Sequence, residues 1–379
     1  MIMQVNFAYK YRIYPTKEQE QLFLKHFGCV RFVWNYFLNE RKKHYLKNKE
    51  EIEAKKIKGN LNYYDNAKEL TLLKREKEWL RDCNSQSLQA TLKHLDSAYK
   101  MFFRKTHKFP NFKNKDAKQS FTIPQHFKLE KRKIYFPKFN EGIKVKVHKK
   151  LNGRFVVATV SKTTTNKYYI SIIVEKNIQA LPTTNKSIGI DLGIKDLIIC
   201  SNSKKYQNIK LLSNLEKKLK YKQKQLCKKV KGSSNRKKAK HKIAVVHEKI
   251  KNIRKDYIHK ITKAIINENQ VIIVEDLDVK GMMRNHKLAK AISDVAWHEV
   301  HRQLEYKSKW NGRTYHVIDR FFPSSKMCSS CNFVNDKLML KDRVWDCPSC
   351  NTKLDRDLNA SINILNQGLN NLQAVGIIV

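Results

Sequence analysis

Two matched cysteine pairs constrain the fold of this chain more than any other feature of its sequence. Cys328 with Cys331 and Cys347 with Cys350 form two C-x-x-C pairs, which fifteen residues separate. Each pair can direct two thiolates at one ion, and the segment between them is long enough for a hairpin that brings the pairs together. The spacing therefore predicts a closed tetrahedral site for structural Zn²⁺. The alternative is a redox dithiol, which would need one C-x-x-C pair at the start of a helix.

Net charge is the second constraint. Lys and Arg number 78 against 34 Asp and Glu, which gives a formal net charge of +44. Such an excess repels itself unless a polyanion lies nearby, and nucleic acid rewards basic contacts because each neutralised phosphate releases condensed counterions. We therefore expect nucleic acid as a partner. The alternative is a solvated lysine-rich surface encoded by an AT-rich genome.

The sequence also predicts the compartment. It contains no run of about 18 apolar residues, so we expect no membrane span. Its first residues lack the basic and apolar regions of a signal peptide, so we expect a cytoplasmic protein with reduced thiols. The four cysteines outside the pairs are then expected to be ligands or core residues and not disulfides: Cys29, Cys83, Cys200 and Cys227.

The first half of the chain predicts a helical module and a small antiparallel sheet. Residues 1–14 alternate like an edge strand, and Pro15-Thr16 begins a helix-rich region that extends to about residue 104. Residues 121–175 favour strands, with turn signals between them. We expect the N-terminal strand to complete this sheet or barrel. Tyr9, Tyr11, Phe32 and Trp34 are expected in a core; the alternative is stacking on bases.

From Ser187 onward the pattern is α/β. The expected elements, in chain order, are a strand pair at 187–202, long helices at 211–231 and 240–267, a buried strand at 271–274, a helix at 289–309, a strand at 314–320 and a last helix at 358–367. Gly368 is expected to end the last helix.

Lysines crowd the polar faces of the two long helices, where few acids balance them. We interpret these helices as a hairpin that contacts phosphates; the alternative is a plain solvated hairpin. The candidate nucleic-acid-binding residues are Lys217, Lys218, Lys220, Lys228, Lys229, Lys237 and Lys238.

Three acidic positions stand out in a chain this basic. Asp191 shares one strand parity with Gly189 and Gly193, and we expect the two glycines to leave room beside the carboxylate for a metal ion and a phosphate. Glu275 ends the buried strand, where open α/β sheets place ligand sites. Asp357 follows Asp355 at the start of the last helix, and the alternative for either is a helix cap.

Carboxylates from separated elements suit Mg²⁺ or Mn²⁺, which prefer oxygen ligands. Two such ions can activate a water and stabilise the leaving oxygen in phosphodiester hydrolysis. We therefore expect a nuclease whose metal ions are held by Asp191, Glu275 and a carboxylate at the start of the last helix. For Asp191 the alternative is an ordinary surface residue on a strand.

Together these motifs resemble the TnpB (OrfB) proteins of insertion sequences over nearly the whole chain. The resemblance is carried by Tyr11–Thr16, Phe27–Asn35, Phe109–Lys113, Gly189–Gly193, Val274–Leu277, Pro323–Cys331 and Asp355–Leu365. The last two blocks are highly specific in combination. The family often has Gly after each C-x-x-C pair, where this chain has Asn332 and Asn351. Asn tolerates the left-handed conformation, so we expect the turns to survive.

The resemblance implies a RuvC/RNase H-like mixed sheet with an inserted Cys₄ zinc ribbon. It also implies a preceding antiparallel wedge barrel, which carries an inserted helical recognition domain. The expected boundaries are 1–14 and 119–184 for the wedge, 15–118 for the helical domain, 185–326 and 354–379 for the RuvC nuclease, and 327–353 for the ribbon.

The implied function is RNA-guided DNA cleavage, as in the related type V CRISPR effectors. The resemblance implies Asp191, Glu275 and Asp357 as the catalytic acids, with Asp357 preferred over Asp355 because it directly precedes the matching Leu358-Asn359-Ala360. The implied partners are a transposon-encoded guide RNA and double-stranded target DNA beside a short recognised motif, bound by a monomer. One alternative is a transposase that joins DNA ends with the same acids. Another is a non-catalytic nucleic-acid-binding regulator, against which the presence of Asp191, Glu275 and Asp357 argues.

Overall fold

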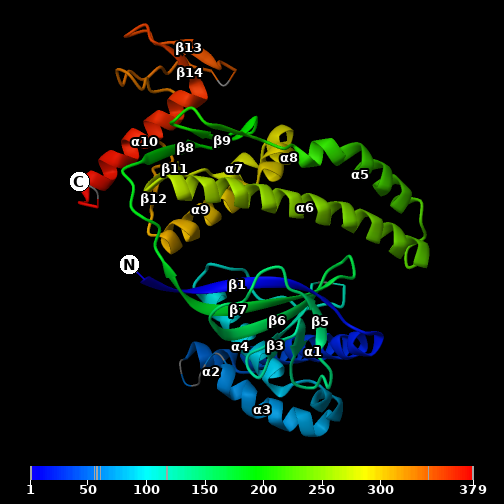
Figure 1. Ribbon diagram of the computed structural model, residues 1–379. Helices are drawn as coiled ribbons and strands as arrows, with labels where there is room; N and C mark the ends of the chain where they lie inside the picture. The colour runs from blue at the N-terminus through cyan, green and yellow to red at the C-terminus, as the bar shows by residue number, and fades with distance from the viewer. Residues whose placement is uncertain are drawn as a thin grey trace. The chain divides into compact units, whose positions relative to one another are not determined.

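The computed structural model describes residues 2–54, 56, 59, 61–116, 118–339 and 341–377. It divides the chain into two compact units (Figure 1). One comprises Gln4–Asn177, and the other comprises the chain from Ile178 onward together with its first residues. None of the helices in the described part of the chain is long and apolar enough to cross a membrane.

The unit Gln4–Asn177 contains a seven-stranded sheet in the order β2-β6-β7-β1-β5-β4-β3. The pairs β2–β6, β6–β7, β1–β5, β5–β4 and β4–β3 are antiparallel. Its strands are β1 (Ile2–Tyr14), β2 (Gln119–Ile123), β3 (Lys128–Glu130), β4 (Lys133–Tyr135), β5 (Ile143–Lys146), β6 (Arg154–Lys162) and β7 (Tyr168–Gln179). The predicted N-terminal strand is confirmed, but the expectation of an edge strand is wrong, because β1 lies inside the sheet between β7 and β5.

Helices pack on this sheet through a shared core. They are α1 (Lys17–Lys47), α2 (Lys49–Glu53), α3 (Tyr63–Glu76), the short 3₁₀ helix η1 (Glu78–Asp82) and α4 (Ser85–Phe103). Thr16 caps α1 in a capping box with Gln19, which explains why the helix begins there. Phe23 of α1 meets Phe121 of β2 and Tyr168 of β7, so strands and helices contribute to one hydrophobic cluster.

The second unit is built on a five-stranded mixed sheet in the order β10-β9-β8-β11-β12. Strands β8 (Ser187–Asp191), β9 (Asp196–Cys200) and β10 (Lys205–Gln207) are antiparallel neighbours. Strands β11 (Val271–Glu275) and β12 (Thr314–Ile318) continue the sheet parallel to β8. The predicted strand Val271–Val274 is confirmed as the buried strand between two parallel neighbours.

Helices cover both faces of this sheet (Figure 1). Helices α6 (Ser234–Glu268) and α9 (Trp297–Asn311) bury apolar residues against Ile190 and Val274. Helix α10 (Arg356–Ala374) packs against the other face, at Ile273. Because β11 lies between two helical layers, it is hydrophobic on both sides, whereas β8 contributes Ile188 and Ile190 to the core on one side and lies against α10 at Gly189 on the other.

The remaining helices are α5 (Leu211–Cys227), α7 (Val279–Met282) and α8 (His286–Val295). The predicted helical hairpin is confirmed as α5 and α6, with Ser233 capping α6. The single helix predicted at 289–309 is wrong, because the chain breaks between α8 and α9 at Ala296, which has a φ of 59°.

The expectation that Gly368 ends the last helix is also wrong. Helix α10 continues to Ala374, and Gly368 is buried within it. A Cβ atom at Gly368 would lie 2.3 Å from the Cγ2 of Ile273. The glycine therefore serves close packing of the helix on β11 and not termination.

Candidate functional site

Asp191 and Glu275 lie at the same edge of the mixed sheet. Ile190 and Val274 are register partners in the parallel pair β8–β11, so the next residue of each strand is the acid. The apolar residues before them anchor both strands between helical layers. Two carboxylates consequently meet at the carboxyl ends of adjacent strands, where α/β sheets place ligand sites.

The two carboxylates influence each other directly. Each residue keeps some exposed surface, yet desolvation raises the pKa of Asp191 well above its ordinary value, and the Glu275 carboxylate beside it raises that pKa further. Desolvation also raises the pKa of Glu275, against a hydrogen bond with Asp191 that lowers it. Burial and the neighbouring carboxylate thus disfavour ionisation of both acids at once.

Asp357 lies nearby on α10 and has a different partner. Asp355 is the N-cap of this helix, since its side chain accepts hydrogen bonds from the backbone N–H groups of Asp357 and Leu358. That leaves the Asp357 carboxylate free of capping, and Arg343 Nη1 lies 3.3 Å from each of its oxygens. The negative charge of Asp357 also contributes to the raised pKa of Asp191.

The three acids do not close into one compact cluster. Within the described residues, the only group of three or more His, Cys, Asp or Glu whose ligand atoms all lie within 4.8 Å of one another is the cysteine group. The structure therefore brings Asp191 and Glu275 together, with Asp357 as an electrostatic neighbour.

The glycines beside Asp191 have a different role from the one expected. A Cβ atom at Gly189 would lie 2.2 Å from the carbonyl oxygen of Ser361 and 2.6 Å from the backbone N of Leu365. At Gly193 it would lie 2.6 Å from the carbonyl oxygen of Asp196. The space at Gly189 is therefore filled by α10, and the expectation of open room there is wrong. This close approach positions α10, and with it Asp357.

The four paired cysteines form the second candidate site. The Sγ atoms of Cys328 and Cys350 are 3.7 Å apart, and those of Cys331 and Cys347 are 3.6 Å apart. Tetrahedral zinc with bonds of about 2.3 Å separates its sulfur ligands by about 3.8 Å, so the cysteine group fits Zn²⁺. Hydrogen bonding from Thr352 lowers the pKa of Cys350 to about 6, which favours the thiolate that a metal requires.

The two turns that present these cysteines are equivalent. Asn332 donates its backbone N–H to the carbonyl of Cys328, and Asn351 does the same to Cys347. Their φ values are 62° and 56°, so the expected left-handed conformation of both residues is confirmed. Strands β13 (Val344–Asp346) and β14 (Lys353–Asp355) form the antiparallel hairpin that carries the second pair.

Two asparagines that the sequence analysis missed connect the cysteine group to α10. Asn359 donates to the carbonyl of Met327 and accepts from the backbone N–H of Ser329. Asn363, one helical turn later, donates to the carbonyls of Met327 and Ser324. Both asparagines are buried, and their spacing of four residues on a helix was the available signal. The first cysteine turn is therefore attached to the helix that carries Asp357.

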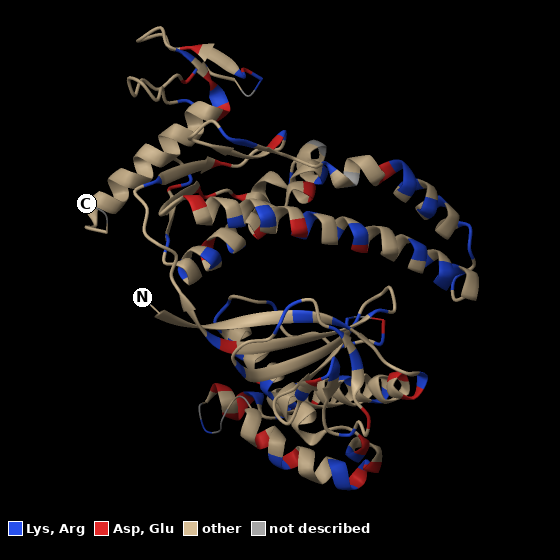
Figure 2. Cartoon of the chain, in the orientation of Figure 1, with Lys and Arg blue, Asp and Glu red and all other residues tan. Residues whose placement is uncertain are grey.

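All seven candidate lysines are exposed on the hairpin of α5 and α6, where Figure 2 shows basic residues far outnumbering acidic ones. Glu216 is one of the few acids on this hairpin, and hydrogen bonds from Lys290 and Lys220 lower its pKa to about 2.

The aromatic residues expected in a core lie in the unit Gln4–Asn177. Tyr9, Tyr11 and Trp34 are buried, so their expected core packing is confirmed, and Phe32 is half-buried.

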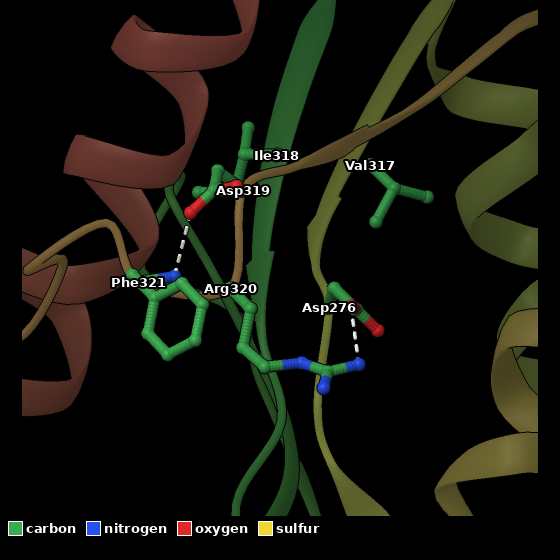
Figure 3. Close-up of a pocket in the computed structure, with 6 residues that line it drawn as sticks. All are labelled: Asp276, Val317, Ile318, Asp319, Arg320 and Phe321. Carbon is green, nitrogen blue, oxygen red and sulfur yellow. Dashed lines mark hydrogen bonds and ion pairs between the residues drawn. The ribbon is translucent and has the colours of Figure 1, made fainter.

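A hollow of about 590 Å³ lies beside Glu275 (Figure 3). It is lined by Asp276, Val317, Ile318, Asp319, Arg320 and Phe321. Because Glu275 pairs with Ile318 in the β11–β12 register, the hollow lies at the carboxyl ends of both strands. The sequence analysis did not identify them.

Comparisons with known proteins identify related families and sequences. The profile of a family described as "Probable transposase" matches residues 160–286, and a Cas12f1-like TNB domain profile matches residues 297–364. A Streptomyces pristinaespiralis protein named "Putative RNA-guided DNA endonuclease" is 37% identical over 97% of this chain and 91% of its own length. A protein of Escherichia coli with the same description, InsQ, is 31% identical over 95% of this chain and 92% of its own.

Among solved structures, the fold is similar to the protein in "Cryo-EM structure of the Cas12f1-sgRNA-target DNA complex". The TM-score is 0.56 at 14% identity, over 96% of this chain and 99% of that one. At this identity the likeness concerns the fold alone.

Proposed function

The chain belongs to the TnpB (OrfB) family, and from this we propose that it is an RNA-guided DNA endonuclease that cleaves target DNA beside a short recognised motif. The observation that carries the proposal is the carboxylate pair Asp191–Glu275 at the carboxyl edge of the mixed sheet. The names of the two relatives and the fold likeness to a protein in complex with guide RNA and target DNA support it.

The acid pair suits a divalent cation. Burial and mutual repulsion disfavour the charged forms of the two carboxylates, and a hard cation such as Mg²⁺ or Mn²⁺, bound by their oxygens, would offset that charge. Asp191 and Glu275 would hold the ion, with Asp357 as a third ligand. When bound, a pair of such ions supplies an activated water and stabilises the leaving oxygen of the phosphodiester. Arg343 holds the Asp357 carboxylate on the helix that packs against Gly189.

The remaining parts take the roles expected from the family. We assign residues 185–326 and 354–379 to a RuvC-like nuclease domain, 327–353 to a zinc ribbon, and the first unit to the wedge and recognition domains. The exposed lysines of α5 and α6 would hold nucleic acid, and a monomer would bind one guide RNA. Base pairing with that RNA would read most of the target sequence, while the protein reads the adjacent motif and duplex shape.

Purification of the protein from its host, sequencing of the bound RNA and incubation of matched DNA with Mg²⁺ test the proposal. We expect cleavage by the parent protein and a loss of at least about a hundredfold in Asp191→Asn, because a metal ligand is removed without a change of shape. Asp256→Asn is the matched control, since Asp256 lies on α6 with a side chain that is 65% exposed. Cleavage that persists in Asp191→Asn contradicts the site assignment.

A transposase that joins DNA ends is the second candidate, which the family description "Probable transposase" favours. It would transfer strands between transposon ends without a guide. The same purified protein, supplied with transposon-end DNA and no matching RNA, separates the two functions. Joined ends in that reaction favour the transposase.

A further inference from the structure

Phe321 is the most exposed large hydrophobic side chain in the described part of the chain, with 87% of its surface accessible. It lies in the hollow beside Glu275, next to Arg320. An apolar ring in water at the edge of a polar site is unfavourable for the isolated protein, because the ring loses the stabilisation that burial would provide. The residues around Phe321 indicate which kind of ligand could cover the ring.

The turn that carries Phe321 is built to present the ring. Asp319 accepts a hydrogen bond from the backbone N–H of Phe321 at 2.8 Å through its side chain, and from that of Phe322 at 3.3 Å through its carbonyl. The neighbouring Phe322 packs against the hydrophobic cluster that includes Val271 and Ile318. Since Phe322 anchors the turn inward and Asp319 closes it, Phe321 is held outward.

The polar groups of the hollow favour a nucleobase over a phosphate. Two carboxylates, Asp276 and Asp319, stand against one guanidinium, so the local charge disfavours an isolated anion. Arg320 Nη2 donates to Asp276 at 2.6 Å, which holds the guanidinium in place and leaves other N–H groups for a ligand. The edge of a base offers both donors and acceptors, which match carboxylates and a guanidinium.

We propose that this hollow takes a nucleobase of the single-stranded DNA whose backbone reaches Asp191 and Glu275, with the base stacked on Phe321 and its edge facing Arg320 and Asp276. The hollow begins one residue after Glu275, so a base held there lies at the carboxyl end of the strand that carries one acid of the pair. Stacking on an aromatic ring accepts any base, as a nuclease guided by pairing requires. The inference rests on the proposed nuclease function only for the identity of the strand.

The test measures binding without cleavage. Full-length protein, with the RNA that it carries from its host, is titrated with a fluorescent dT oligonucleotide that contains one 2-aminopurine, with no added divalent cation. We expect Phe321→Ala to weaken binding about five- to hundredfold, the loss of one base–aromatic stack, and to restore 2-aminopurine emission. Phe321→Trp should keep both signals, whereas Phe321→Leu should lose them.

The control is Phe103→Ala, which removes a ring that is 60% exposed on α4. Because Phe321 makes so little buried contact, its alanine variant should unfold at the parent temperature, so a binding loss is not a folding loss. Unchanged DNA binding in Phe321→Ala, or a loss confined to an otherwise identical U-containing RNA, overturns the inference.

Cleavage separates this inference from the proposed function. A parent protein that cuts guide-matched DNA, with a Phe321→Ala variant that binds and cuts equally well, refutes the base pocket and leaves the nuclease intact. A parent protein that cuts nothing, but whose DNA binding falls in Phe321→Ala, refutes the nuclease and supports the pocket.

Discussion

Replacement of Gly189 by alanine should separate α10 from β8. The new Cβ atom would lie 2.2 Å from the carbonyl oxygen of Ser361, whereas ordinary contact begins at 3.4 Å, so the two elements must move apart by about 1.2 Å. Both nearest atoms belong to the backbone of α10, so no side-chain rotation relieves the clash. Overpacking of this kind costs about 1–3 kcal/mol.

Stability and activity should both fall. The melting temperature falls by about 2–4 °C for each kcal/mol of unfolding free energy that is lost. A loss of about 3 kcal/mol therefore lowers the melting temperature of the second unit, which begins at Ile178, by about 6–12 °C. Asp357 lies on the displaced helix, and a misplacement of about 1 Å near a reacting centre costs about a hundredfold in rate. Scanning calorimetry and the guide-matched cleavage assay measure the two effects.

Gly28→Ala is the matched control. Gly28 lies within α1, and nothing is within 4 Å of its added Cβ atom. Alanine there should stabilise the other unit by about 0.5–1 kcal/mol, since glycine is unfavourable inside a helix. If Gly189→Ala unfolds at the parent temperature and cleaves at the parent rate, the reasoning about close packing is refuted.

Three further predictions concern the metal, the lysines and pH. Elemental analysis should find one Zn²⁺ per chain. Cys328→Ser should lose the zinc and some thermal stability, because a buried ligand of a closed site is removed. A parent protein without zinc contradicts this prediction. Replacing the seven candidate lysines by glutamine should reduce the salt dependence of DNA binding by about one in log–log slope for each lost phosphate contact; an unchanged slope argues for a merely solvated hairpin. Burial lowers the pKa of Lys307 to about 8 from an ordinary value of 10.5, so between these values the unfolded chain holds the extra proton and stability rises with pH. The free energy of unfolding, measured by chemical denaturation, should therefore rise from pH 8 to pH 10 in the parent and rise less in Lys307→Met. An equal rise in parent and variant would contradict this.

Local sequence patterns predicted most of the elements correctly. The alternation of β1, the capping residues before α1 and the apolar spacing of α5 and α6 are all properties of adjacent residues, and each was confirmed. The errors fell where a long-range contact decides. Gly368 lies within α10 against Ile273. The predicted helix breaks at Ala296, next to Trp297, which is buried and donates from Nε1 to the carbonyl of Gly193.

The candidate sites divide in the same way. The sequence by itself determined the cysteine group, since C-x-x-C spacing brings two thiolates together within a single turn and a short hairpin supplies the other two. It also determined that Glu275 ends a strand, whereas the end of β8 at Asp191 came from the structure. Only the tertiary structure decided that Gly189 admits α10, that Arg343 reaches Asp357, and that Phe321 faces solvent beside Glu275. Those three relations join residues distant along the chain, and their energies depend on distances that no local pattern contains.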